Sequence, residues 1–226
     1  MDYDSVPLRD FKELNDWETV IFVYQSALKQ VETKIDILNG EFQHRHKYNP
    51  IEHVKSRIKT PESIVKKLKR HGYESSIENM VRYVNDIAGI RISCSFTSDI
   101  YLIADMISKQ NDLTILARRD YMKNPKKSGY RSYHMLITVP IQTTKGICPT
   151  KVEIQIRTIA MDFWASLEHK IYYKFEGNAP QYISEELREC AAITSKLDAK
   201  MLSLNEAIIA EKERQQREEE QKKYLK

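Results

Sequence analysis

Apolar residues follow helical spacing at both ends of the chain. Near the N-terminus they recur at intervals of three or four, at Leu14, Trp17, Ile21, Tyr24, Leu28, Val31, Ile35 and Leu38. A second seam contains Leu187, Cys190, Thr194, Leu197, Met201, Leu204 and Ile208. This periodicity predicts two long helices, the first ending near Gly40 and the second capped by Ser184. Narrow seams can pack on the domain or on partner helices, and the spacing alone leaves both interpretations open.

Between these ends, helical and strand patterns alternate. Helical patterns occupy 60–72, 77–86, 99–109 and 158–177, and strand patterns occupy 89–96, 113–122, 130–139 and 151–157. Thr60 is a suitable N-cap, Pro61 suits the first helical position, and Gly72 follows the end of that helix. The alternation predicts an α+β fold with a mixed sheet of four or five strands flanked by helices. We divide the chain into an N-terminal helix (1–40), a central domain (41–180) and a C-terminal helix with a charged tail (181–226).

The predicted strand at 151–157 separates apolar from polar residues. Val152, Ile154 and Ile156 share one face, so Glu153 and Gln155 lie on the other, together with Lys151 and Arg157. A sheet with one solvated face shows the same alternation. The pattern therefore becomes informative only if a neighbouring strand is also polar on that face.

The segment SGYRSYH at 128–134 supplies such a neighbour. Alternation places Tyr130, Ser132 and His134 on one side of the strand that follows Gly129. If this strand adjoins 151–157 with the polar faces together, the sheet carries a carboxylate, a histidine, an aromatic ring and a cation. That mixture suits a nucleotide site.

Asp86 and a set of basic residues extend this candidate site. Asp86 lies where a helix gives way to a strand, and taken alone it is more often a helix C-terminal residue or a turn former. Paired with Glu153, it would hold magnesium, which takes a few protein carboxylates plus substrate phosphates. Basic and hydroxyl residues flank the polar strands at Arg57, Lys59, Ser63, Lys67, Arg91, Lys126 and Lys127. Each alone reads as a surface residue, but their clustering favours phosphate chemistry, which needs a metal, cations and a base.

Composition and the absence of certain motifs argue against several other classes of protein. The chain has 226 residues, 30% of them charged, and a formal net charge of +4, which permits a phosphate-rich ligand without requiring one. The cysteines Cys94, Cys148 and Cys190 are widely spaced, which argues against a disulfide framework. No apolar run is long enough to cross a membrane, and we expect a cytoplasmic protein. Phosphate-binding loop, dinucleotide-binding and zinc-protease motifs are absent from the sequence.

Four segments in order resemble the synthetase domain of the RelA/SpoT alarmone enzymes: RIKTPESIVKKL, DIAGIRI, SGYRSYH and VEIQIRTIAMDFWASLEHKIYYK. The resemblance covers about residues 14–205 and is strongest to the small alarmone synthetases of the RelP type. It implies a nucleotidyltransferase-like, five-stranded synthetase domain. It also implies transfer of a pyrophosphoryl group from ATP to the 3′-hydroxyl of GDP or GTP, which yields (p)ppGpp and AMP.

The resemblance also implies residue roles. Asp86 and Glu153 would bind Mg²⁺, and Glu153 would alternatively deprotonate the 3′-hydroxyl. ATP would contact residues of the donor side: Arg57, Lys59, Ser63, Lys67 and Arg91. GDP or GTP would contact residues of the acceptor side, with Tyr130 stacked on guanine: Lys126, Tyr130, His134 and Gln155.

Further implications concern partners and alternatives. The family resemblance implies a homotetramer through the terminal helices, whereas the sequence contains no HD-type motif of the family's hydrolase domain. Relatives of the RelQ type use the segment matching 49–57 for allosteric product binding, and His53, Lys55 and Ser56 depart from that pattern. The competing hypotheses are a catalytically inactive guanine-nucleotide- or RNA-binding regulator and a different nucleotidyltransferase. RNA binding is not expected because no aromatic-basic stripe extends beyond the site.

Overall fold

Five strands form one mixed sheet at the centre of the molecule. The computed structural model describes residues 16–46, 48–175 and 180–224. The strands are β1 (Ile51–Ile58), β2 (Ala88–Cys94), β3 (Thr114–Asp120), β4 (Tyr133–Thr143) and β5 (Gly146–Thr158). Their order is β1-β2-β5-β4-β3; β2 and β5 are parallel, and the other neighbouring pairs are antiparallel. The predicted α+β fold with a five-stranded mixed sheet is confirmed.

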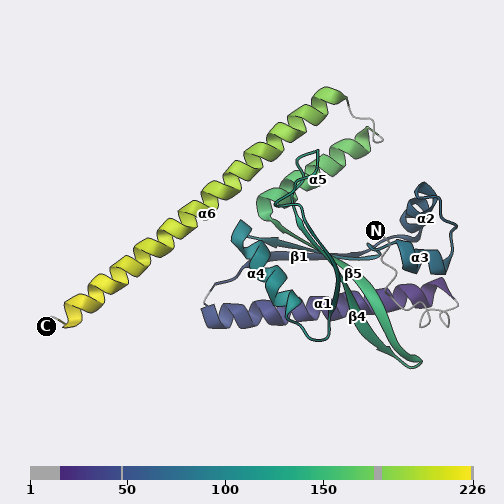
Figure 1. Ribbon diagram of the computed structural model, residues 1–226, viewed down its shortest axis with the longest axis horizontal. Coiled ribbons are helices and arrows are strands. Elements are labelled where there is room, and N and C mark those ends of the chain that lie inside the picture. The colour runs from purple at the N-terminus through teal and green to yellow at the C-terminus, as the bar shows by residue number, and fades with distance from the viewer. Residues whose placement is uncertain (1–15, 47, 176–179, 225–226) are drawn as a thin grey trace.

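Six helices surround this sheet in the described part of the chain (Figure 1). They are α1 (Trp17–His46), α2 (Pro61–Arg70), α3 (Ile77–Tyr83), α4 (Thr97–Ser108), α5 (Ile159–Lys174) and α6 (Gln181–Tyr224). Helices α1 and α4 pack on the sheet, α2 contacts α3 at one end, and α5 contacts α6 at the other. None of the described helices has both the length and the apolar character needed to cross a bilayer.

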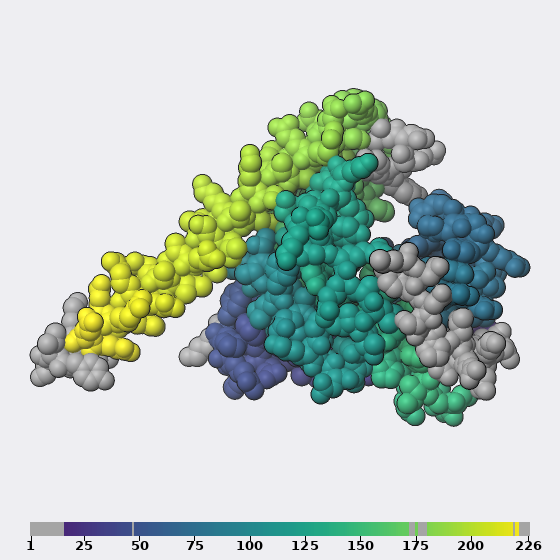
Figure 2. All heavy atoms as spheres, in the orientation of Figure 1, coloured from purple at the N-terminus to yellow at the C-terminus, as the bar shows by residue number. Residues whose placement is uncertain are grey.

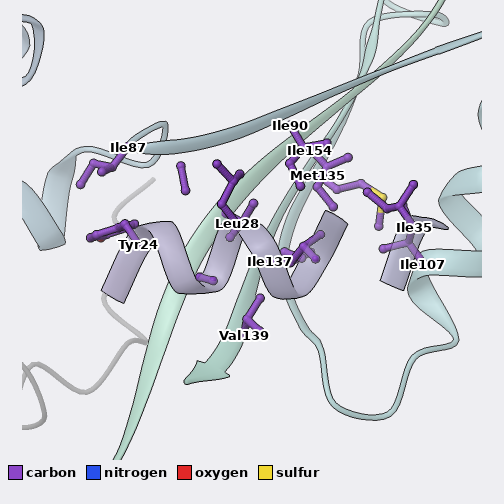
Figure 3. Close-up of a cluster of buried hydrophobic side chains, with 14 of the residues drawn as sticks. Tyr24, Leu28, Ile35, Ile87, Ile90, Ile107, Met135, Ile137, Val139 and Ile154 are labelled. Atoms are coloured by element: carbon purple, nitrogen blue, oxygen red, sulfur yellow. The ribbon is translucent and has the colours of Figure 1, made fainter. Parts of the chain in front are cut away.

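The main core lies between α1, α4 and one face of the sheet. Figure 3 shows Leu28 of α1 close to Met135 and Ile154 of the sheet, with Tyr24 toward one end of this cluster and Ile35 toward the other. All five side chains are buried. The predicted N-terminal seam is therefore a core-packing seam along most of its length, and Leu14 lies outside the described residues.

Several predicted boundaries differ from the structure. Helix α1 continues past Gly40 to His46, and α6 begins at Gln181 rather than after Ser184. Phe96 is not an inward strand residue but precedes the first residue of α4. Thr60 does cap α2, since its hydroxyl accepts from the Ser63 amide, with Pro61 in the first turn.

Helix α6 contacts the body only along its first half. Leu187 and Ala191 are buried in a small second cluster with Trp164 of α5, and the Trp164 indole donates to the Leu187 carbonyl at 2.9 Å. Asp198 is also buried and accepts from the Thr158 hydroxyl at 2.9 Å. Beyond Asp198 the helix extends away from the domain (Figures 1 and 2).

Candidate active site

The strand register aligns two rows of residues across the face of the sheet opposite to the core. The first row crosses all five strands in the order Lys55, Arg91, Gln155, His134 and Arg119. The second row contains Arg57, Gly89, Glu153, Leu136 and Ala117 in the same strand order. Since side chains in register point to the same face, the sheet presents charged groups from β1 to β3 on one surface.

A hollow of about 230 Å³ opens over β1, β2 and β5. It is lined by Lys55, Ser56, Arg57, Asp86, Gly89, Ile90, Arg91, Glu153 and Gln155. Gly89 lies in register between Arg57 and Glu153, and a Cβ there would be 3.9 Å from the Arg57 Cγ. The missing side chain leaves room between the guanidinium and the carboxylate. We call this space the first hollow.

A second hollow of about 140 Å³ lies on the β4 side of the same carboxylates. Its lining residues are Lys67, Asn85, Asp86, Ala117, Arg119, His134, Met135, Leu136 and Glu153. Asp86 and Glu153 are the two lining residues that the hollows share. Two separate spaces therefore meet at one pair of carboxylates.

Asp86 is held by two lysines from different elements. Lys59, which follows β1, donates to Oδ2 at 2.9 Å, and Lys67 of α2 donates to Oδ1 at 2.7 Å. Burial alone would raise the pKa of Asp86, but the bonds from Lys67 and Lys59 outweigh it and hold the pKa below its ordinary value. Asp86 is therefore ionised at neutral pH, with a cation on each oxygen.

Glu153 is also kept in its charged form. Burial acts to raise its pKa, while the neighbouring His134 imidazole and a 2.8 Å bond from the Gln155 amide lower it below the ordinary value. The Nδ1 atom of His134 lies 3.6 Å from Glu153 Oε1. An ionised carboxylate beside an imidazole is competent to accept a proton from a nearby hydroxyl.

An aromatic and basic cluster lies next to the second hollow. Tyr130 precedes β4, and its hydroxyl is 2.9 Å from His134 Nε2. The ammonium of Lys126 lies 4.8 Å from the centre of the Tyr130 ring, and the guanidinium of Arg157 lies 5.0 Å from it. Tyr121 packs edge-to-face against both Tyr130 and His134. The cluster presents a partly exposed ring surrounded by cations.

The structure brings most of the predicted site residues together, although some of them contact the lining without forming it. Lys59 bonds to Asp86, Tyr130 bonds to His134, and Lys126 lies over the Tyr130 ring.

Three other residues depart further from their expected positions. Ser63 lies at the exposed start of α2, where its hydroxyl accepts from Thr60, and it does not line either hollow. Gln155 was expected on the acceptor side with His134, but it lines the first hollow rather than the second. Ser132 is fully buried and donates its hydroxyl bond to the Ile156 carbonyl, so it offers no free polar group to either hollow.

Arg157 is a site residue whose role the sequence analysis missed. Its side chain is buried, and it donates to the Tyr130 hydroxyl at 2.6 Å, to the side-chain amide oxygen (Oε1) of Gln155 at 2.7 Å and to Asp162 at 3.2 Å. Asp162 also pairs with Arg91 at 3.2 Å. A buried arginine thus connects the ring cluster of the second hollow with the lining of the first.

Lys151 and Arg119 were also missed. Lys151 was expected on the polar sheet face, but it is only 2% exposed and bonds to the segment before Asp86. Burial lowers the pKa of Lys151 to about 8. Arg119 lies beside His134 in register and lines the second hollow. Charge patterns mark both residues as polar, but only the strand register shows which neighbours they meet.

The donor set fits a hard divalent cation that is completed by a substrate. Within the described ranges, no group of three or more His, Cys, Asp or Glu could hold a metal by itself. Asp86 and Glu153 supply ionised carboxylates at the border of both hollows. Mg²⁺ commonly binds to one or two carboxylates and takes its remaining ligands from phosphates and water.

Comparisons with known proteins agree with this arrangement. A family model described as "Region found in RelA / SpoT proteins" matches residues 56–178. The GTP pyrophosphokinase YwaC of Bacillus subtilis (strain 168) is 46% identical over 209 residues, which cover 92% of this chain and 100% of that protein.

Solved structures show the same fold. The crystal structure of small alarmone synthetase 2 from Bacillus subtilis has a TM-score of 0.78 and 46% identity, and the match covers 85% of this chain and 100% of that one. Small alarmone synthetase 1 from Bacillus subtilis, bound to its product pppGpp, has a TM-score of 0.80 and 35% identity, with 85% and 98% of the chains covered. The matched residues include β1 to β5 in part or whole and both shared carboxylates, and the chain belongs to the RelA/SpoT family.

Proposed function

We propose that this protein is a GTP/GDP pyrophosphokinase. It transfers the β,γ-pyrophosphoryl group of ATP to the 3′-hydroxyl of GDP or GTP, which forms ppGpp or pppGpp and releases AMP. The observation that carries the proposal is that two hollows share Asp86 and Glu153. A transfer between two bound nucleotides needs two spaces that meet at the reacting groups. Relatives named GTP pyrophosphokinase support the same reaction.

The first hollow is assigned to ATP. Arg57 and Arg91 line it from adjacent strands, and planar guanidinium groups stack well on an adenine ring. Lys59 and Lys67 form ion pairs with Asp86 in this structure. When ATP binds, they would form ion pairs with its phosphates instead. Ser63, at the N-terminal turn of α2, would add a hydroxyl contact.

The second hollow is assigned to the acceptor nucleotide. The Tyr130 ring would stack on guanine, with Lys126 and His134 near the phosphates. Gln155 contacts Glu153 and is aligned with both Arg91 and His134, so we place it between the two substrates. Arg119 would contribute a further positive charge to this side.

Asp86 and Glu153 would hold Mg²⁺ together with the ATP phosphates. The bound ion would offset the negative charge that develops on the transferred group. Glu153 is placed to accept the proton of the 3′-hydroxyl as the oxygen attacks the β-phosphorus, while AMP departs with the bridging oxygen. Both carboxylates are present and ionised, which favours an active enzyme over the inactive regulator considered above.

A homo-oligomer, with a tetramer as the expected state, is part of the proposal. Five apolar residues along one side of α6 are between 47% and 58% exposed: Ile193, Leu197, Met201, Leu204 and Ile208. Such a contiguous exposed stripe is typical of an interaction surface. We also expect a cytoplasmic location, where ATP and guanine nucleotides are available.

The decisive experiment follows both products. The protein is incubated with labelled ATP, Mg²⁺ and either GDP or GTP, and the nucleotides are separated by chromatography. We expect AMP and a 3′-pyrophosphorylated guanosine nucleotide in equal amounts, and no reaction when the metal is chelated. Absence of the guanosine product with intact, folded protein would refute the proposed function.

A further inference from the structure

Lys151 is a buried lysine that the chemistry above does not use. It lies on β5, and its side chain points to the same sheet face as Glu153, two residues further along. Lysine is rarely fully buried, because removing an ammonium from water is costly unless its hydrogen bonds are replaced. A lysine that is 2% exposed in the middle of this fold therefore needs a specific set of partners.

Those partners all belong to one segment. The Nζ atom donates to the Val81 carbonyl at 3.1 Å, the Arg82 carbonyl at 3.0 Å and the Asn85 side-chain oxygen at 3.0 Å. An ammonium has three N–H donors, so its bonding capacity is filled. Two acceptors lie at the end of α3, where the helix dipole also favours a cation. The next residue after Asn85 is Asp86.

The bonds of Lys151 therefore join the two elements that carry the shared carboxylates. Glu153 is fixed because β5 pairs with β2 at this position. Asp86 lies two residues before the start of β2 and has no such pairing with a neighbouring strand. On the other side of Asp86, the Lys59 amide donates to the Ile87 carbonyl at 2.8 Å. Asn85 is held by Lys151, so Asp86 lies between two anchored residues.

We propose that Lys151 is a positioning residue for the metal site, which keeps Asp86 at the correct separation from Glu153. This inference rests on the proposed function. When the ATP phosphates draw Lys59 and Lys67 away, Asp86 loses both of its lysine partners, and the Lys151 bonds still hold the preceding segment. Partners of this kind, behind a ligand, commonly change metal affinity or activity by about 10- to 100-fold when they are removed.

Lys151→Met tests the inference, since methionine has a similar length and suits a buried site but donates no hydrogen bond. We expect a fall in kcat of about 10- to 100-fold. The KM values for ATP and GDP should change much less, because Lys151 does not line either hollow. An effect through general loosening of the domain would instead change both KM values and the melting temperature together.

Mn²⁺ binding provides a readout that is independent of turnover. Free Mn²⁺ is measured by electron paramagnetic resonance in the presence of protein and α,β-methylene ATP. The Mn²⁺ Kd of Lys151→Met should rise by a factor similar to the fall in kcat. If wild-type protein binds Mn²⁺ and forms product but Lys151→Met matches it in both, the inference is wrong while the proposed function stands.

Thr150→Val is the matched control. Thr150 is the neighbouring residue on β5, is fully buried, and donates its hydroxyl bond to the Cys148 carbonyl rather than to the Asp86 segment. It should retain wild-type kcat and Mn²⁺ affinity. If Lys151→Met fails to fold, Asn85→Ala removes one of the three bonds and should raise the Mn²⁺ Kd several-fold; an unchanged Kd would overturn the inference.

Discussion

At the scale of single residues, the environment of Glu153 supports its proposed role as the base. The carboxylate is neighboured by His134 and Gln155, and its pKa is held below the ordinary value despite burial. It therefore remains a base at neutral pH and needs no other group to deprotonate it. Asp86, by contrast, has both oxygens bonded to lysines, so in the proposed reaction it can bind a metal only after Lys59 and Lys67 turn to the ATP phosphates.

Glu153→Gln should reduce turnover by a factor on the order of 10² to 10⁴, because it removes the proposed base and a proposed metal ligand while keeping the side-chain shape. ATP affinity, measured by calorimetry without the acceptor, should remain near the wild-type value. Tyr130→Ala should instead affect binding more than turnover, and should mainly raise the KM of GDP and GTP. Substantial activity in Glu153→Gln would remove Glu153 from the role of base.

Individual site residues can be predicted from the sequence where the alternation of apolar and polar residues along a strand shows which face each one occupies. Glu153 and His134 follow from the alternation in their strands, and the structure places both along the predicted face. The burial of Lys151 and Arg157 could not be predicted in this way. Both residues lie on the same strand face as Glu153. The C-terminal end of α3 covers Lys151, whereas Tyr130 and Asp162 cover Arg157.

At the scale of elements, strand β1 shows why part of the sheet escaped prediction. Its apolar residues Ile51, Val54 and Ile58 are spaced by three and four, as in a helix. The strand lies at the sheet edge, and its register shifts between Ile51 and His53, so strict alternation is lost. Pairing with β2, rather than local pattern, makes this segment a strand and places Arg57 beside Gly89.

Helix α6 supports the loop that carries Tyr130. Gly129 has φ of +90°, and a Cβ built there would lie 2.5 Å from the Ala191 Cβ on α6. Gly129→Ala combines a conformation costing about 1–3 kcal/mol for other residues with a steric clash. We expect a lower melting temperature and a raised KM for the acceptor nucleotide, with a smaller change for ATP, measured by steady-state kinetics.

Gly146→Ala is the matched control for that variant. Gly146 also has a positive φ, of +125°, but nothing lies within 4 Å of its added Cβ, and it belongs to the hairpin between β4 and β5. It should lose stability without a change in either KM. Adding Ala191→Gly to Gly129→Ala should restore part of the acceptor affinity. Failure of that rescue would show that α6 does not set the Tyr130 loop.

The docking of α6 should depend on pH through Asp198. Burial raises the pKa of this carboxyl, so the folded state holds the proton at a pH where the unfolded state has released it. Stability consequently falls as pH rises from the ordinary carboxyl pKa of about 4 through the raised value. Asp198→Asn keeps an acceptor for Thr158 and should melt at a higher temperature than wild type near pH 7, with the difference shrinking toward pH 4.

Circular dichroism melts across that range would measure the effect. Asp105→Asn on the exposed side of α4 is a suitable control, since it removes only a surface ion pair with Lys109 and should change the melting temperature little. If Asp198→Asn were less stable than wild type at every pH, its hydrogen bond with Thr158 would matter more than its burial.

At the scale of the whole molecule, the two long helices differ in what their seams contact. The apolar residues of the α1 seam are buried in the core, whereas the stripe on α6 from Ile193 to Ile208 is exposed in the single chain. Figure 2 shows this helix extending beyond the body of the domain. The sequence shows both seams equally, and only the packed structure separates the core helix from the candidate interface.

The combined variant Met201→Glu/Leu204→Glu should lower the oligomeric mass measured by analytical ultracentrifugation, because it buries charge in the proposed interface. Ala199→Glu provides the control: it is exposed and lies two positions from Met201, so it faces another direction. The double variant should remain folded. Unchanged mass in the double variant would exclude this stripe as the contact.

The meeting of two hollows at Asp86 and Glu153 also bears on how the protein could be inhibited. A single compound that joins an adenosine-like and a guanosine-like part through a phosphate linker could occupy both spaces at once. Linking the parts makes the second contact intramolecular, so such a compound should bind far more tightly than either half. The linker length that gives the tightest binding would then measure, in solution, the span between the two nucleotide positions.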